Sequence, residues 1–351
     1  RLYGGGESGT MPGADPHELA TVLGRKIELA TDATERRALR LRLADVHETR
    51  RRDDYEAVAQ LTAVLDSDAR DADALAGLER LYRKLSSWPE LLDVMDRRAL
   101  LAPAGAPRAE QVLAAARLVE QELSDPDAAV PRYGAVLQLL PSHAAAREAL
   151  WDLADRDDLA VAATGVLERT YRAERDADGL ARVHERRLRL TGEDPASRRA
   201  EWSALADVHE TMRGDTRAAF DVWARALADD TDELELLGPL ERLAGMDGRW
   251  DDLAAALTPR IAAARSRGDA EAEHALAMRL GAMHEDARRD APAATAAYEL
   301  AVAAGVQEGA ALAALERVAA RASDHPRLAE VLAREAAASD NDAAAADFLF
   351  R

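Results

Sequence analysis

Three histidine–glutamate pairs are the residues in this sequence whose types best suit acid–base or metal chemistry. They are His47-Glu48, His209-Glu210 and His284-Glu285. An imidazole can bind a metal ion or exchange a proton near neutral pH, and a neighbouring carboxylate can orient it. The glutamates of successive pairs lie 162 and 75 residues apart, however, and the sequence contains no HExxH motif that would place two histidines on one helical face. The pairs therefore do not indicate one shared centre.

Other signals for catalysis or cofactor binding are weak. The Asp-rich segments 66–73 and 229–235 resemble calcium loops in composition, but they lack the glycine and the final glutamate of an EF-hand loop in register. The sequence has no cysteine, which excludes thiolate metal sites and cysteine nucleophiles. It also lacks GxSxG, phosphate-loop and dinucleotide-binding motifs. We expect no enzyme activity, no metal and no cofactor, and we interpret the histidines as structural residues.

The spacing of the glutamates indicates an internal repeat. Glu48 precedes three equivalent glutamates by 72, 162 and 237 residues, namely Glu120, Glu210 and Glu285. The same offsets relate two hydrophobic columns, which are Val46 with Leu118, Val208 and Met283, and Leu61 with Tyr133, Trp223 and Tyr298. Repeats of this kind are typical of solenoids, in which each repeat packs only on its neighbours.

The elements that carry these residues are predicted to be helices. In the first complete repeat, apolar residues at three- and four-residue spacing predict helices over 35–51, 54–65, 73–85 and 88–101. Alanine and leucine supply much of the 48% hydrophobic content while aromatic residues make up 4%, a composition that favours helix. We therefore predict an all-α chain with no sheet.

The offsets also predict where the repeats begin and end. We expect a continuous solenoid over 16–345, with repeats one to four near 35–107, 108–199, 200–269 and 270–340. In repeat two, Leu167 matches Leu78 at an offset of 89 instead of 72, which predicts an extra helix within 141–158. Residues 1–15 are expected to be the end of a truncated unit with a Gly-rich loop, and 341–351 the start of another truncated unit.

Both helix pairs of repeat one resemble the tetratricopeptide repeat. The first pair carries that pattern with one residue inserted in the turn, through Leu43-Ala44, His47, Ala57, Leu61 and Val64. The second carries it through Leu78, Tyr82, Trp88, Leu91 and Met95. HEAT-like and other α-solenoid repeats are the alternative. The resemblance implies a right-handed solenoid of stacked antiparallel helix pairs. The sequence pattern of the repeats is similar to that of long bacterial scaffold arrays.

The resemblance also implies a site, because the first helix of each tetratricopeptide pair lines a concave groove. The polar residues that it places there are Asp45, Glu48, Arg117, Glu120, Asp207, Glu210, Glu285 and Asp286, and the apolar residues beside them are Leu41, Leu113 and Met278. Most of this face is acidic, and we expect its glutamates to point to solvent. The resemblance thus implies an acidic groove that binds a basic protein segment.

Net charge limits the partners. The formal charge of -19 argues against non-specific binding to nucleic acid or to anionic membranes, since both need a basic surface. No run of eighteen apolar residues or signal-peptide pattern is present, so we expect no membrane insertion. The leading hypothesis is a protein–protein interaction scaffold, and the alternative is a structural arm of a larger assembly. The sequence leaves the oligomeric state open, and the compartment open between cytoplasm and periplasm.

Overall fold

The computed structural model describes residues 15–192, 194–229 and 233–338. These residues form eighteen α-helices and three π-helical turns, and within them there is no strand. None of the described helices is long and apolar enough to cross a membrane. The truncated units expected over 1–15 and 341–351 lie outside the described residues, apart from Asp15.

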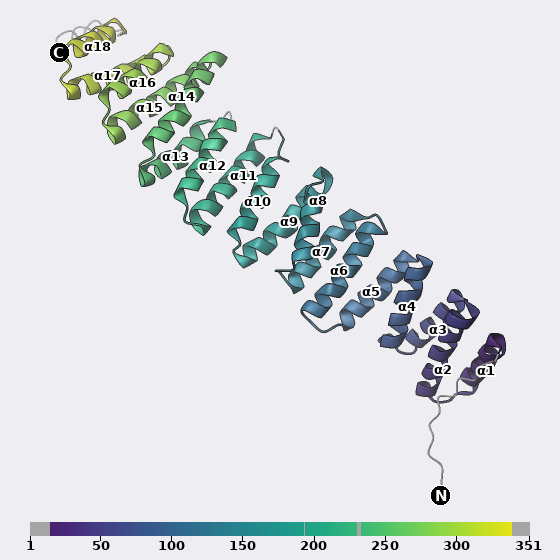
Figure 1. Cartoon of the computed structure of the whole chain (residues 1–351). Coiled ribbons are helices and arrows are strands. Elements are labelled where there is room, and N and C mark those ends of the chain that lie inside the picture. Colours follow the sequence, from purple (N-terminus) through teal and green to yellow (C-terminus); the bar gives the residue numbers. More distant parts are fainter. Residues whose placement is uncertain (1–14, 193, 230–232, 339–351) are drawn as a thin grey trace. The chain divides into compact units, whose positions relative to one another are not determined.

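The chain divides into two compact bodies, and the N-terminal one spans residues 1–174. Its helices are α1 (Pro16–Leu29), α2 (Ala33–Asp45), α3 (Asp54–Leu65), α4 (Ala72–Leu85), α5 (Trp88–Leu101), α6 (Ala106–Gln121), α7 (Pro126–Leu139), α8 (Ala144–Ala154) and α9 (Asp157–Glu174). Each helix packs against the next one in the sequence, so that short turns join them into stacked antiparallel pairs (Figure 1). This packing is that of a tetratricopeptide-like solenoid.

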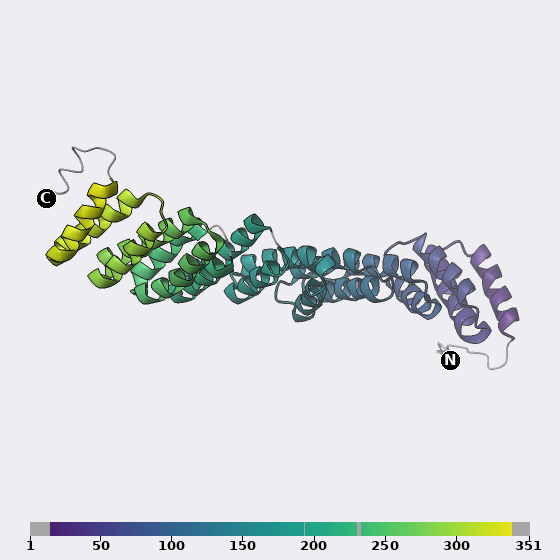
Figure 2. The ribbon, with the colours of Figure 1, turned by 90° about the horizontal axis from the view of Figure 1, so that it is seen from above.

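The second body, residues 175–351, repeats the same pattern. Its helices are α10 (Ala177–Leu188), α11 (Pro195–Asp207), α12 (Thr216–Asp229), α13 (Glu233–Asp247), α14 (Trp250–Arg267), α15 (Ala270–Ala282), α16 (Ala291–Ala303), α17 (Glu308–Ala322) and α18 (His325–Ala338). Figure 2 shows the successive hairpins of this body from a second direction. Within each body most contacts join helices that are neighbours in sequence, and some join helices two apart, such as α12 and α14.

An aspartate starts the second helix of the first pair in every repeat. The side chains of Asp53, Asp125, Asp215 and Asp290 each accept a hydrogen bond from the backbone amide three residues later, at 3.2, 3.0, 2.9 and 3.1 Å. Such N-caps satisfy an amide that has no partner inside the helix. The internal repeat is therefore visible in single hydrogen bonds.

The turn before this cap is one residue longer than an ordinary helix hairpin needs. In repeats one, three and four the first helix ends in a π-helical turn, which is η1 (Val46–Arg51), η2 (Val208–Met212) or η3 (Met283–Arg288). A left-handed residue follows each π turn, with φ of 54° at Arg52, 64° at Gly214 and 53° at Arg289. The predicted insertion of one residue in the turn thus takes the form of a widened last helical turn.

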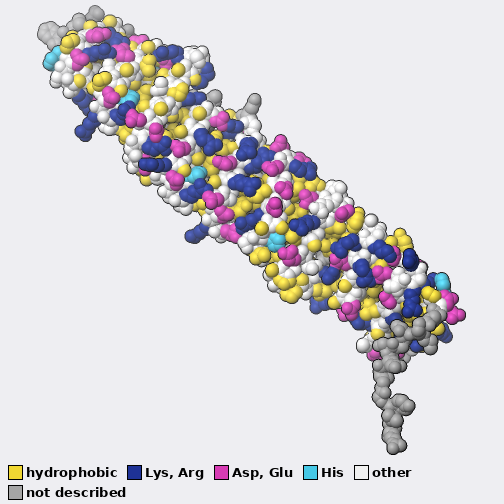
Figure 3. Space-filling view, viewed as in Figure 1, with side chains coloured by type: hydrophobic (Ala, Val, Ile, Leu, Met, Phe, Trp, Pro, Cys, Tyr) yellow, Lys and Arg dark blue, Asp and Glu magenta, His cyan; other side chains and the backbone are white. Residues whose placement is uncertain are grey.

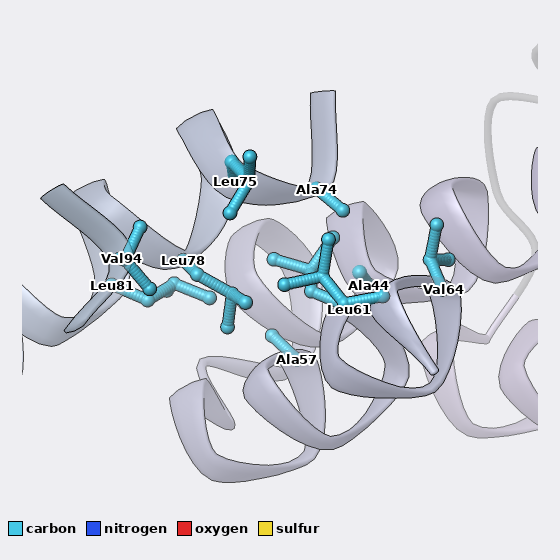
Figure 4. Close-up of a cluster of buried hydrophobic side chains, with 10 residues drawn as sticks. Ala44, Ala57, Leu61, Val64, Ala74, Leu75, Leu78, Leu81 and Val94 are labelled. Atoms are coloured by element: carbon cyan, nitrogen blue, oxygen red, sulfur yellow. The ribbon is translucent and has the colours of Figure 1, made fainter. Parts of the chain in front are cut away.

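The core between adjacent pairs is built from aliphatic residues at the predicted spacing. Figure 4 shows the cluster of repeat one, in which Leu61, Leu78 and Leu81 are almost fully buried between α3, α4 and α5. Burial of each such side chain contributes on the order of 1.5–3 kcal/mol. Small residues allow the close approach, and a Cβ added at Gly281 would overlap the ring of Tyr298.

The segment 141–158, where an extra helix was expected, contains α8 and the start of α9. The imidazole of His143 caps α8 by accepting from the amide of Ala146, as Asp71 caps α4 by accepting from Ala74. Leu150 is fully buried on α8. Helix α9 packs against both α7 and α8. Repeat two therefore has three helices, α8 to α10, where repeat one has α4 and α5.

Candidate partner-binding face

The residues predicted to line a groove all lie on the first helix of a pair. Those helices are α2 with η1, α6, α11 with η2, and α15 with η3. Asp45, Arg117, Asp207 and Asp286 are exposed. Figure 3 shows that acidic and basic side chains alternate over the visible face, without a large area of either charge. What each carboxylate can bind therefore depends on its own neighbours.

The recurring glutamate is bound by an arginine in three of the four repeats. Arg80 donates to Glu48 at 2.9 Å, Arg242 donates to Glu210 at 2.6 and 2.7 Å, and Arg317 donates to Glu285 at 2.8 Å through two nitrogens. Each arginine lies on the first helix of the following pair, 32 residues after its glutamate. The ion pair therefore ties two consecutive helix pairs together. We call it the Glu–Arg clamp.

The prediction that these glutamates point freely to solvent is wrong. Their side chains are 16%, 25% and 5% exposed at Glu48, Glu210 and Glu285. A carboxylate held by a forked guanidinium is already neutralised and is a poor site for a second cation. The signal that could have revealed this was present in the sequence, because an arginine follows three of the four glutamates at constant spacing.

Repeat four has the most complete clamp. Glu285 also accepts from the hydroxyl of Tyr298 at 2.9 Å and from Arg321 at 2.6 Å. The hydrogen bonds from Arg317 hold the pKa of Glu285 below its usual value, whereas burial and the bond to Glu285 raise the pKa of Tyr298 to about 12. This carboxylate is structural and remains charged at neutral pH.

Repeat two lacks an arginine at the clamp position. Tyr133, which is fully buried, donates its hydroxyl to Glu120. The residue 32 positions after Glu120 is Asp152, which is exposed. Within the described part of the chain no cation forms an ion pair with Glu120. Of the four predicted glutamates, this one has no arginine bonded to it among the described residues, although Arg117 lies near enough for its charge to act on Tyr133.

The histidines that precede three of these glutamates pack inside the helix hairpins next to an arginine. His47 and His284 are buried, and the guanidinium of a nearby arginine contacts Nδ1 of each, at 3.1 Å from Arg51 and 3.4 Å from Arg288. Burial and the neighbouring positive charge lower the pKa of both. The described residues contain no group of three potential metal ligands. The histidines therefore pack in the hairpin as neutral rings.

The three apolar residues proposed as anchors are less available than expected. Leu113 is only 4% exposed, so the prediction that it offers an anchor to a partner is wrong. Leu41 and Met278 are half-buried and pack against the cores of repeats one and four. These residues belong to the interfaces between helices because their apolar spacing is the same spacing that forms the core.

A hollow of about 460 Å³ opens beside the clamp of repeat four. Its apolar lining consists of Ala291, Val318 and Ala322, and its charged lining of Glu285, Asp286, Arg289 and Arg321. In repeat three the positions of Ala291 and Ala322 are held by Thr216 and Asp247, and the Thr216 hydroxyl donates to Asp247 at 2.7 Å. Alanines at the equivalent positions leave the hollow open.

Comparison with known proteins adds little beyond the fold. No family model matches the sequence, and no curated protein matches it. The C-terminal part of a TPR repeat-containing protein from Cytophaga hutchinsonii is similar over 78% of this chain and 99% of its own, with 12% identity and a TM-score of 0.26. A tetratricopeptide repeat protein from Parabacteroides merdae is similar over 86% of this chain and 99% of its own, with 15% identity and a TM-score of 0.23.

Proposed function

We propose that this chain is a non-catalytic scaffold that holds a basic segment of a protein partner against the first helices of its pairs. A stack of helix hairpins presents one helix of each pair along an extended surface, and such surfaces are used for protein recognition. The net charge of -19 favours a basic partner. Since the clamps neutralise three of the four recurring glutamates, the exposed aspartates are the better candidates for contact.

The hollow of repeat four is the observation that best supports the proposal. Its lining combines Ala291, Val318 and Ala322 with one exposed carboxylate, Asp286, since Glu285 is already bound by Arg317 and Arg321. Arg321 approaches Asp286 only to 3.8 Å, and the aspartate side chain is 75% exposed. An apolar side chain next to a lysine or arginine would fit this arrangement. Burial of the apolar group would supply affinity, while the charges would speed encounter and select the partner.

The proposal is tested by neutralising three exposed aspartates of the first helices, Asp45, Asp207 and Asp286, to asparagine. We expect binding to Lys- and Arg-rich peptides from a peptide array to weaken at least tenfold, and wild-type binding to weaken with added salt because exposed charges are screened. A matched control replaces the same number of exposed acids on second helices of their pairs, Glu56, Asp127 and Glu330, by the corresponding amides.

The control variant should bind as the wild type does. If the control fails while the first-helix variant binds normally, the recognition face is the opposite one. If neither the wild type nor either variant binds any linear peptide, and crosslinking recovers only folded neighbours, the chain is a structural arm of a larger assembly and the scaffold proposal is wrong.

A further inference from the structure

The Glu–Arg clamp is a guanidinium-binding site that this chain builds three times. In repeat four the site consists of the Glu285 carboxylate, the Tyr298 hydroxyl that donates to it at 2.9 Å, and Arg317, whose Nε and one terminal nitrogen each lie 2.8 Å from a carboxylate oxygen. Repeats one and three hold an arginine on the equivalent glutamate in the same way. The position of the guanidinium is thus fixed by the repeat itself.

Repeat two keeps the receiving side of this site and lacks the arginine. Glu120 and Tyr133 stand where Glu285 and Tyr298 stand, and Tyr133 again donates to the glutamate. Asp152 occupies the arginine position on α8, where Leu150 and Leu153 are buried as Leu78 and Leu81 are on α4. The exchange replaces the cation by a second carboxylate.

Cations elsewhere in the N-terminal body leave the position open. Arg169 on α9 is the residue that matches Arg80 at an offset of 89, so the extra helix has moved the arginine one helix further along. Arg169 and Arg117 are both exposed, and neither forms an ion pair with Glu120 or Asp152 among the described residues. The arginine that the site requires is therefore not supplied by the described part of the chain.

We propose that Glu120, Tyr133 and Asp152 receive the guanidinium of an arginine from a partner protein, which takes the place that an arginine of the chain itself fills in the other repeats. The proposal deepens the scaffold function proposed above and rests on it, because it names one anchoring residue of the basic partner. It requires arginine instead of lysine, since a planar fork can bond to both oxygens of one carboxylate and a lysine ammonium cannot.

Tyrosine resonances give a direct test, because the chain has 6 tyrosines and Tyr298 is an internal control. The ring of Tyr133 is followed by NMR in 13C-tyrosine-labelled protein during titration with acetyl-Gly-Arg-Gly-amide and, separately, with acetyl-Gly-Lys-Gly-amide. We expect a saturable shift at Tyr133 with the arginine peptide, no shift at Tyr298, and at least a several-fold weaker effect of the lysine peptide. Equal responses at the two tyrosines, or equal effects of the two peptides, would overturn the proposal.

Two reciprocal variants test the position itself. Asp152→Arg places an arginine 32 residues after Glu120 and should abolish the response at Tyr133 by closing the clamp. Because Arg321 also bonds to Glu285, Arg317→Asp combined with Arg321→Ala should open the clamp of repeat four and give Tyr298 a response; Arg317→Ala replaces Arg317→Asp if the aspartate variant loses helicity. A Tyr133 response that persists in Asp152→Arg contradicts the proposal.

The failure of this site can be told apart from failure of the scaffold function. If array peptides bind Asp152→Arg as tightly as they bind the wild type, the chain is still a scaffold but Glu120 is not its arginine receptor. If the arginine peptide shifts the Tyr133 resonance while no array peptide binds, the proposed arginine site at Glu120 is supported and the proposed peptide-binding face is wrong.

Discussion

Glu285 illustrates how a residue that is predicted to bind a partner can instead hold two consecutive helix pairs together. Its carboxylate accepts from Arg317, Arg321 and Tyr298 and keeps 5% of its side chain exposed. Breaking such a pair leaves a partly buried charge without its partner, which costs more than the pair contributes when both residues are removed together. Glutamate-to-lysine changes at the clamps would therefore disturb the stacking of helix pairs as well as any binding.

The three histidines that precede the recurring glutamates predict a pH dependence of stability. The pKa of His47, His209 and His284 is lowered from 6.5 by burial and by the adjacent arginine. The unfolded chain then binds more protons than the folded chain below about pH 6.5, so the free energy of unfolding should fall as pH is lowered through that range. Above it the contribution of the histidines is complete. Urea unfolding from about pH 7.5 to about pH 5.5 measures this slope.

The control for this slope comes from repeat two, where Val119 occupies the histidine position. Replacing all three histidines by valine should flatten the dependence in this range while leaving the helical content unchanged. A slope that is the same in the wild type and in the triple variant would mean that other groups cause it.

At the scale of the helix, the hairpin turn carries a local strain that can be relieved. Arg52 and Arg289 have left-handed backbone conformations that cost a side-chain-bearing residue roughly 1 kcal/mol, and Gly214 occupies the same position in repeat three. We expect Arg52→Gly and Arg289→Gly each to raise the free energy of unfolding by up to about 1 kcal/mol. Gly214→Arg should lower it by a similar amount. Chemical denaturation checks all three, and a Gly214→Arg variant as stable as the wild type would contradict the strain.

The sequence predicts the helices well because their boundaries are set by local chemistry. The helices expected over 54–65 and 88–101 are observed as α3 and α5 with the same bounds, since apolar spacing and neighbouring capping residues act within a few residues. The direction of Glu48 depends instead on Arg80, in the next helix pair. Burial of Leu113 likewise depends on the neighbouring helices. Such contacts become predictable only when the spacing between residues of different helix pairs is compared from one repeat to the next.

At the scale of the whole molecule, destabilisation of one helix should spread only to the helices that pack against it. Each described helix of a body packs on those next to it in sequence, as repeat architectures require. Leu78→Ala removes a side chain that is 2% exposed and should cost about 2–5 kcal/mol locally. We expect hydrogen exchange to accelerate in α3, α4 and α5 and to stay unchanged in α15 to α18.

The control for this experiment is Val161→Ala, because Val161 is 70% exposed and its truncation should change exchange nowhere. Faster exchange throughout both bodies in Leu78→Ala would show that the chain unfolds as one cooperative unit instead of repeat by repeat.

The Glu–Arg clamp has a consequence for how such an array can grow by gene duplication. Both partners of a clamp are encoded within one repeat, as with Glu48 and Arg80, which lie 32 residues apart. A repeat that is copied whole therefore brings both partners of its own clamp, so the contact between its two helix pairs is charge-balanced from the first generation. An insertion that does not span a whole repeat separates the two, as Glu120 and Arg169 are separated in repeat two. Duplication of whole repeats thus preserves the Glu–Arg clamps. Insertion of part of a repeat leaves a glutamate without its arginine, and selection can use that carboxylate for a new contact.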